Sequence, residues 1–173
     1  MPKVKLNEGE DTADAAVAIE IVEGDLCPVY RARVLRGVKV GPSPDWMRYR
    51  LMSVGVRPIS NIVDVTNYIL MELGQPLHAF DMSRLARRDG KTLIRVERAE
   101  EGQRFVTLDG AERVLTERDL LIEDAEKPVA LAGVTGGQKT EVGESTAEVL
   151  LECAVFKRAS IRKTARRLGL SSE

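Results

Sequence analysis

Cysteine, histidine and aromatic residues are all scarce in this chain of 173 residues. The two cysteines, Cys27 and Cys153, lie far apart, and neither has a neighbouring cysteine or histidine, so the spacing of a zinc site is absent. We therefore expect no metal site and two buried, reduced thiols. No apolar run approaches the length of a membrane span, and the acidic N-terminus is unlike a signal peptide. We predict a soluble, cytoplasmic protein with no membrane partner.

Net charge is also nearly absent, because 26 basic residues oppose 27 acidic ones. No overall field therefore draws the protein toward nucleic acid. The charge is uneven along the chain, however, since six basic residues near the C-terminus have no acid among them. They are Lys157, Arg158, Arg162, Lys163, Arg166 and Arg167. These residues form either a solvated helix face or a contact with phosphate.

The sequence signatures of nucleotide binding and of serine hydrolases are missing too. There is no phosphate loop, no dinucleotide fingerprint and no serine at a nucleophile elbow. The glycine-rich segment 133–137 follows an apolar strand but lacks the Lys-Ser/Thr pair of a phosphate loop. It forms either a tight bend or a place where a substrate ring approaches the backbone closely.

Hydrophobic patterning predicts helices mainly in the first half of the chain. Residues 1–16 are polar and poorly patterned, and we expect a poorly ordered lead-in before one domain over 17–173. Ser43 suits the N-cap, and Pro44 the first turn, of a helix that ends near Gly55. One face of this helix would carry the apolar residues Met47, Leu51 and Val54.

The segment 61–73 carries conflicting signals, because its β-branched residues favour a strand by propensity. Its apolar residues nevertheless recur at helical spacing. Ser60 or Asn61 can cap the start, and Gly74 stands where a left-handed residue ends a helix. We predict a helix.

Most of the remaining chain reads as short strands, which are either strongly apolar or alternating. The predicted strands cover 19–22, 30–40, 92–96, 104–108, 111–115, 119–122, 129–132 and 149–153. Asp109-Gly110 is a hairpin turn between two of them, and a basic amphipathic helix over 160–168 follows the last. There is little βαβ alternation, so we predict the α+β class, with a mixed, largely antiparallel β-sheet core and a few flanking helices.

Two acidic or titratable side chains stand at unusual places. His78, the sole histidine, lies between apolar neighbours and is either a structural residue or a catalyst. Glu152 interrupts an apolar strand, and a carboxylate is costly to desolvate without a dedicated partner. Either a structural arginine satisfies Glu152, or this side chain lines a pocket and binds a hydroxyl or an amine.

Five segments together resemble one family, the central editing region of the bacterial phenylalanyl-tRNA synthetase beta subunit, which comprises its third and fourth modules. They occur in one order and at consistent spacing, and the likeness runs from about residue 17 to the end. The segments are 56–68 (Val-Arg-Pro-Ile-Ser-Asn-Ile-Val-Asp-Val-Thr-Asn-Tyr), 72–81 (Glu-Leu-Gly-Gln-Pro-Leu-His-Ala-Phe-Asp), 132–137 (Ala-Gly-Val-Thr-Gly-Gly), 149–154 (Val-Leu-Leu-Glu-Cys-Ala) and 164–170 (Thr-Ala-Arg-Arg-Leu-Gly-Leu).

The resemblance implies a domain that hydrolyses tyrosine misattached to phenylalanine tRNA. It implies a role for Glu152 in accepting a hydrogen bond from the tyrosine phenol, which phenylalanine cannot supply. The water would be activated by His78 or by hydroxyl groups of the substrate itself. The candidate catalytic residues are His78, Thr66 and Asn67, the candidate substrate-binding residues are Glu152, Gly136, Gly137, Arg57 and Ser172, and the candidate RNA-binding residues are Arg162, Lys163, Arg166 and Arg167.

The same resemblance implies two partners, the acceptor end of phenylalanine tRNA and the synthetase alpha subunit in an alpha2-beta2 assembly. No cofactor is expected in this domain, because ATP and Mg²⁺ would serve the activation site elsewhere in the synthetase. Two departures from the family are visible. Thr135 replaces a larger apolar or aromatic residue, and the chain stops at Glu173 where relatives continue. We therefore expect an excised fragment, truncated at its C-terminal end, and the alternative function is a non-catalytic scaffold for the tRNA acceptor end.

Overall fold

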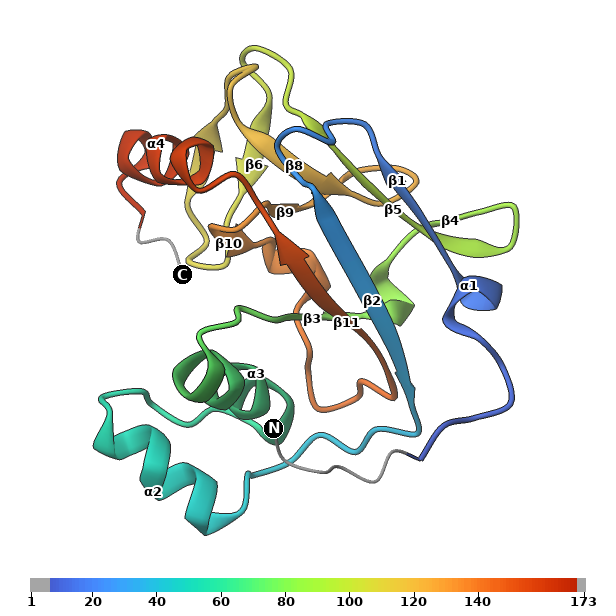
Figure 1. Ribbon diagram of the computed structural model, residues 1–173, viewed down its shortest axis with the longest axis vertical. Coiled ribbons are helices and arrows are strands. Elements are labelled where there is room, and N and C mark those ends of the chain that lie inside the picture. Colours follow the sequence, from blue (N-terminus) through green and yellow to red (C-terminus); the bar gives the residue numbers. More distant parts are fainter. Residues whose placement is uncertain (1–6, 171–173) are drawn as a thin grey trace.

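Two β-sheets share one hydrophobic core in the computed structural model, which describes residues 7–170 (Figure 1). In the larger sheet β1 runs parallel to β5, and every other pair is antiparallel. Its strand order is β1-β5-β8-β9-β10, with β4 also paired to β5. The strands are β1 (Val17–Ile21), β4 (Arg87–Arg88), β5 (Lys91–Arg98), β8 (Leu120–Glu123), β9 (Pro128–Leu131) and β10 (Thr135–Gly136).

The smaller sheet is antiparallel and has β11 at its centre. It comprises β2 (Val29–Arg36), β11 (Glu148–Val155) and β3 (His78–Asp81). A separate hairpin pairs β6 (Arg104–Val106) with β7 (Glu112–Val114) around the predicted Asp109-Gly110 turn, where Gly110 adopts a φ of 77°. The predicted α+β class with a mixed, largely antiparallel sheet core is confirmed.

Two helices lie together at one end of the molecule, and a third packs against one face of the larger sheet (Figure 1). The helices are α1 (Ala13–Ala16), α2 (Asp45–Ser53), α3 (Asn61–Leu73) and α4 (Arg158–Leu168), with single 3-10 turns η1 (Met82–Arg84) and η2 (Gln138–Thr140). Of the segment expected to be a poorly ordered lead-in, residues 13–16 form α1, and residues 1–6 lie outside the described part of the chain.

The ambiguous segment is the helix α3, as predicted from its spacing and its caps. The Ser60 hydroxyl accepts a hydrogen bond from the backbone N–H of Val63 at 3.5 Å, and Gly74 ends the helix with a φ of 69°. The buried side chains of α3 are nevertheless polar, namely Asp64 and Thr66. Of the apolar residues at helical spacing, Val65 and Leu73 are exposed, and Ile62, Ile69 and Leu70 are half-buried.

The predicted cap of α2 is wrong. Pro44 is the N-cap of α2, and Ser43 makes no cap hydrogen bond there. The Ser43 hydroxyl instead donates to the buried Asp64 carboxylate at 2.5 Å, and that carboxylate also accepts the backbone N–H of Ile59 at 2.7 Å. A carboxylate buried away from water needs such donors, whereas the N–H groups of an exposed helix terminus can bind water instead. Ser43 and Asp64 therefore join α2 to α3.

Two apolar clusters hold the larger sheet in place, one on each side. The first fills the space between the sheets, where Ile94 and Ile122 meet Phe80 and Leu150 of the smaller sheet. The second contains residues of the opposite face, and it packs against the inward side of α4. The second cluster comprises Ala99, Phe105, Leu115, Leu121, Leu131, Val134, Ile161 and Ala165. The strands of the larger sheet are thus covered on both sides, which explains their continuous apolar runs.

A pair of acidic side chains on the larger sheet makes stability depend on pH. Burial and the neighbouring Glu97 raise the pKa of Glu123 from 4.5 to about 7. Because the folded state holds this proton more tightly than the unfolded state, the contribution of Glu123 to stability falls as pH rises from about 4.5 to about 7. We expect Glu123→Gln to raise the urea midpoint relative to wild type at about pH 8 but not at about pH 4.5.

Glu97→Gln is the matched variant, because it removes the same repulsion from the other side. It should also flatten the pH dependence of the urea midpoint. An unchanged difference between the acidic and alkaline midpoints in both variants would contradict this account of the pair.

Candidate functional site

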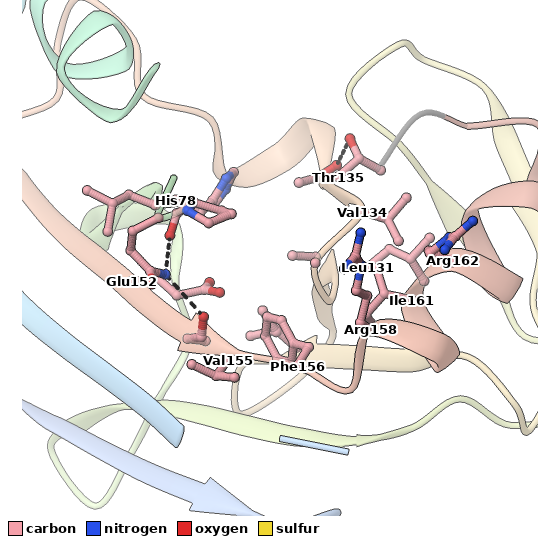
Figure 2. A pocket seen from close by; sticks show the side chains of 18 residues that line it. His78, Leu131, Val134, Thr135, Glu152, Val155, Phe156, Arg158, Ile161 and Arg162 are labelled. Atoms are coloured by element: carbon pink, nitrogen blue, oxygen red, sulfur yellow. Dashed lines mark hydrogen bonds between the residues drawn. The ribbon is translucent and has the colours of Figure 1, made fainter. Parts of the chain in front are cut away.

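A cavity of about 510 Å³ opens between the two sheets and the start of α4. Its walls come from β3 and the loop before it, from β9 and β10, from the end of β11 and from the first turns of α4. Glu152 and His78 stand on one side of the cavity, while Arg158 and Arg162 of α4 face it from the other (Figure 2). The lining mixes apolar surface with a few polar groups, as small-molecule sites do.

The strand register places His78 beside Glu152. The two residues are direct partners across the β11–β3 pair, so their side chains leave the same face of the smaller sheet. Glu152 is buried, with 6% of its surface exposed. Two residues that are far apart in the sequence are therefore brought together.

Gly136 completes this part of the cavity through close packing of its backbone. A Cβ atom at Gly136 would lie 2.6 Å from Cε1 and 2.9 Å from Nε2 of His78. The glycine thus makes room for the imidazole of His78, rather than leaving an empty space above the backbone.

His78 is held as a neutral imidazole. Burial lowers its pKa from 6.5 to about 4. The ring also packs edge-on against Phe80, with the two ring centroids 4.4 Å apart. A neutral imidazole offers one N–H donor and one acceptor nitrogen. At neutral pH His78 can therefore orient a water molecule or a substrate hydroxyl without adding a positive charge.

The Glu152 carboxylate accepts a hydrogen bond from a phenol of the protein itself. The Tyr30 hydroxyl donates to Oε2 of Glu152 at 3.2 Å, and both side chains are buried. Burial and the charge of Glu152 raise the pKa of Tyr30 well above 10, and the same two causes raise the pKa of Cys27 to about 11. The sequence predicts a structural arginine or a pocket ligand as the partner of Glu152, and it does not reveal Tyr30. The only local signal was the inward position of Tyr30 in an alternating strand.

Four of the predicted catalytic and substrate-binding residues are not among the described residues that line the cavity, namely Arg57, Thr66, Asn67 and Gly137. Thr66 lies within α3, where its hydroxyl donates to the carbonyl of Val63 at 2.7 Å. Arg57 is exposed in the loop between α2 and α3. The cavity therefore unites His78 and Glu152 with Gly136, while the polar residues of α3 stand apart from it.

Gly137 and Ser172 complete the predicted substrate-binding set. A Cβ atom at Gly137 would lie 2.8 Å from the carbonyl oxygen of Val129 and 3.0 Å from the ring of Phe105, so this glycine serves close packing inside the fold. Ser172 lies outside the described residues. Thr135, the residue that departs from the family pattern, lines the cavity.

The predicted RNA-binding residues divide into two groups. Arg162 lines the cavity together with Arg158 one turn earlier, and both are exposed. Lys163 and Arg166 are exposed as well. Arg167 instead forms an ion pair with the buried Asp119 and donates to the Val114 carbonyl at 3.2 Å. Its charge therefore anchors α4 to the strands beneath.

Residues 7–170 contain no group of three His, Cys, Asp or Glu side chains that could hold a metal ion. Within the same range, no helix is long and apolar enough to cross a membrane.

The profile of the B3/4 domain family matches residues 26–173. The chain belongs to the B3/4 domain family, and the curated proteins that it resembles are beta subunits of phenylalanine–tRNA ligase. It is 61% identical to the beta subunit of Oleidesulfovibrio alaskensis over 173 residues, which is 100% of this chain and 21% of that protein. The beta subunit of Streptococcus pneumoniae is 52% identical over 171 residues, 99% of this chain and 21% of that protein. The chain thus spans about a fifth of the length of these relatives.

A solved structure has the same fold. It is an N-terminal fragment of the phenylalanyl-tRNA synthetase beta subunit from Pyrococcus horikoshii, which matches with a TM-score of 0.57. The match covers 98% of this chain and 52% of that chain at 14% sequence identity. At this identity the likeness concerns the fold alone.

The neutral state of His78 can be tested directly, because the chain contains a single histidine. With a pKa of about 4, its imidazole resonances should not titrate between about pH 8 and about pH 5.5 in an NMR experiment. A transition near the ordinary value of 6.5 would contradict burial of the ring in the folded protein.

Gly136→Ala should displace the imidazole, because its new Cβ atom would overlap Cε1 of His78. The displaced ring would gain contact with water, and its pKa should move up toward 6.5 in the same NMR titration. Gly24→Ala is the matched control, since a Cβ atom there meets nothing within 4 Å. If the His78 titration were identical in both variants, the close approach of Gly136 would not determine the position of the ring.

Proposed function

We propose that this domain hydrolyses the ester of tyrosine misattached to phenylalanine tRNA. The observation that carries the proposal is the register pair of Glu152 and His78 at the wall of one cavity. A buried carboxylate supplies an acceptor for a phenol, and a neutral imidazole supplies a site for water. The family membership supports the same assignment, because the relatives are subunits of a phenylalanine–tRNA ligase.

Selection of tyrosine depends on the hydroxyl group that distinguishes it from phenylalanine. A site that hydrogen-bonds this hydroxyl rejects phenylalanine, because the buried carboxylate of Glu152 would then lose a partner on closing over an apolar ring. The cavity therefore discriminates by a positive contact rather than by size. A site that attaches phenylalanine to tRNA can exclude tyrosine only by giving the extra hydroxyl no space and no hydrogen-bond partner.

In the proposed reaction, water attacks the ester carbonyl carbon, and the bond between that carbon and the ribose oxygen breaks. The products are free tyrosine and tRNA with an intact terminal ribose, whose oxygen takes up the proton released by the water. His78 accepts a hydrogen bond from the attacking water through its unprotonated nitrogen. No cofactor takes part in this step.

The acceptor end of phenylalanine tRNA would enter past α4. Arg158 and Arg162 face the cavity, and guanidinium groups bind phosphate in bidentate geometry. In a full ligase the synthetase alpha subunit would be the second partner, in an alpha2-beta2 assembly. The competing function is a non-catalytic scaffold for the acceptor end, which the position of Thr66 and Asn67 away from the lining favours.

Glu152 should determine specificity more than rate. We expect Glu152→Gln to reduce the preference for tyrosyl over phenylalanyl ester by about 1.5–3 kcal/mol, the scale of a hydrogen bond to a charged group. The loss should fall on kcat/KM for the tyrosyl ester in deacylation assays with this chain. Equal slowing of both esters would indicate a structural or catalytic role for Glu152. If the wild-type chain hydrolyses neither ester, the non-catalytic scaffold for the acceptor end is favoured.

RNA binding by this chain should be weak and moderately sensitive to salt, because only two basic residues, Arg158 and Arg162, are among the described residues that line the cavity. If about two to four phosphates are neutralised, log K should fall against log salt with a slope on the order of −2 to −4. Arg162→Ala should make this slope shallower by about 1. Lys139→Ala, a single charge removed elsewhere on the surface, is the control, and an equal change in slope would rule out a special role for α4.

A further inference from the structure

On the side that faces the protein interior, the Glu152 carboxylate contacts the phenol of Tyr30. Tyr30 lies on β2 and is 8% exposed, and its hydroxyl donates to Oε2 of Glu152 at 3.2 Å. The strand register explains the contact. Glu152 pairs with Ala32 across β2 and β11, and Tyr30 lies two residues from Ala32, so its side chain leaves the same face of the sheet.

Tyr30 contacts Glu152 but does not itself line the cavity. It is absent from the described residues that line the cavity, whereas Glu152 is among them. Its ring belongs to the core between the two sheets, together with Phe80 and Leu150. The packed ring has little freedom, so the position of its hydroxyl is set by the core and not by the substrate.

The hydroxyl of Tyr30 is a permanent donor. Burial first, and then the charge of Glu152, raise the pKa of Tyr30 well above 10, so the phenol keeps its proton at every physiological pH. Cys27 lies nearby, but its thiol donates to the Val29 carbonyl at 3.6 Å. Donation to a carboxylate favours its ionised form.

We propose that Tyr30 is a positioning residue for substrate selection, whose hydroxyl holds the Glu152 carboxylate ionised and oriented toward the cavity. The proposal rests on the proposed function. A carboxylate has about four lone-pair positions, so it can accept hydrogen bonds from Tyr30 and from a substrate hydroxyl together. The site would thus recognise the substrate phenol with a carboxylate that is oriented by a phenol of the protein.

The first test compares Tyr30→Phe with wild type, because this change removes the hydroxyl and keeps the ring. The ligands are hydrolysis-resistant adenosine analogues that carry tyrosine or phenylalanine through a 3′-amide. Tyr30→Phe should reduce the preference for the tyrosyl analogue roughly five- to thirtyfold, through weaker binding of that analogue alone. Tyr49→Phe, which removes an exposed phenol, is the matched control and should leave the preference unchanged.

The second readout is the pH dependence of the preference. Preference for tyrosine needs the ionised carboxylate, so it is present at higher pH and disappears on acidification. Removing the Tyr30 hydroxyl favours the protonated carboxyl, so the loss should begin at a higher pH in Tyr30→Phe than in wild type. The other titratable and basic groups that face the carboxylate or its cavity are Cys27, His78, Arg158 and Arg162, and all of them are unchanged in this variant.

A double-variant cycle separates positioning from general structural support. If Tyr30 acts through Glu152, adding Tyr30→Phe to Glu152→Gln should change the tyrosine preference no further. Additive effects, equal losses for the two analogues, or an unchanged preference in Tyr30→Phe would each overturn the proposal. Should Tyr30→Phe not fold, 3-fluorotyrosine incorporated at position 30 gives a more acidic, stronger donor, and the acid limit of the preference should then move to lower pH.

The two proposals fail in different ways. If the wild-type chain prefers the tyrosyl amide but hydrolyses no tyrosyl ester, the hydrolytic proposal is wrong. The role of Tyr30 is then still decided by the amide preference of the Tyr30→Phe variant. A wild-type chain without any preference between the amides would overturn both.

Discussion

The central position of β11 between β2 and β3 is the constraint on which the cavity depends. One strand supplies Glu152, its neighbour on one side supplies Tyr30, and its neighbour on the other side supplies His78. Because side chains alternate across a strand, a register shift of one residue would turn Glu152 away from both partners. The hydrophobic core between the sheets fixes this register, since Phe80 and Leu150 share the buried face with Glu152.

Burial has opposite consequences for the two titratable groups of the cavity. Burial lowers the pKa of His78 to about 4, so its imidazole is neutral at physiological pH. Glu152 influences its neighbours as a charge, which raises the pKa of both Tyr30 and Cys27. A charged acceptor and a neutral imidazole thus stand side by side at one wall of the cavity.

The basic residues of α4 illustrate how one sequence feature serves two purposes. Arg158 and Arg162 face the cavity. Arg167, only five positions further, is bound to the buried Asp119 and holds the helix against the sheet. One basic residue of α4 thus attaches the helix to the fold, while two others remain exposed at the cavity.

Local patterns in the sequence determined the secondary structure, the class of fold and the family likeness, because helix spacing, caps and turn residues act over a few positions. The helix α3 was predictable in this way from Ser60 and Gly74. Contacts between distant residues were decided by the tertiary structure alone. The Ser43 hydroxyl donates to Asp64, 21 positions away, instead of capping α2, and Glu152 accepts a hydrogen bond from a tyrosine 122 positions away. Sequence spacing carries no information about such partners, since burial and strand register, which exist only in the folded chain, select them.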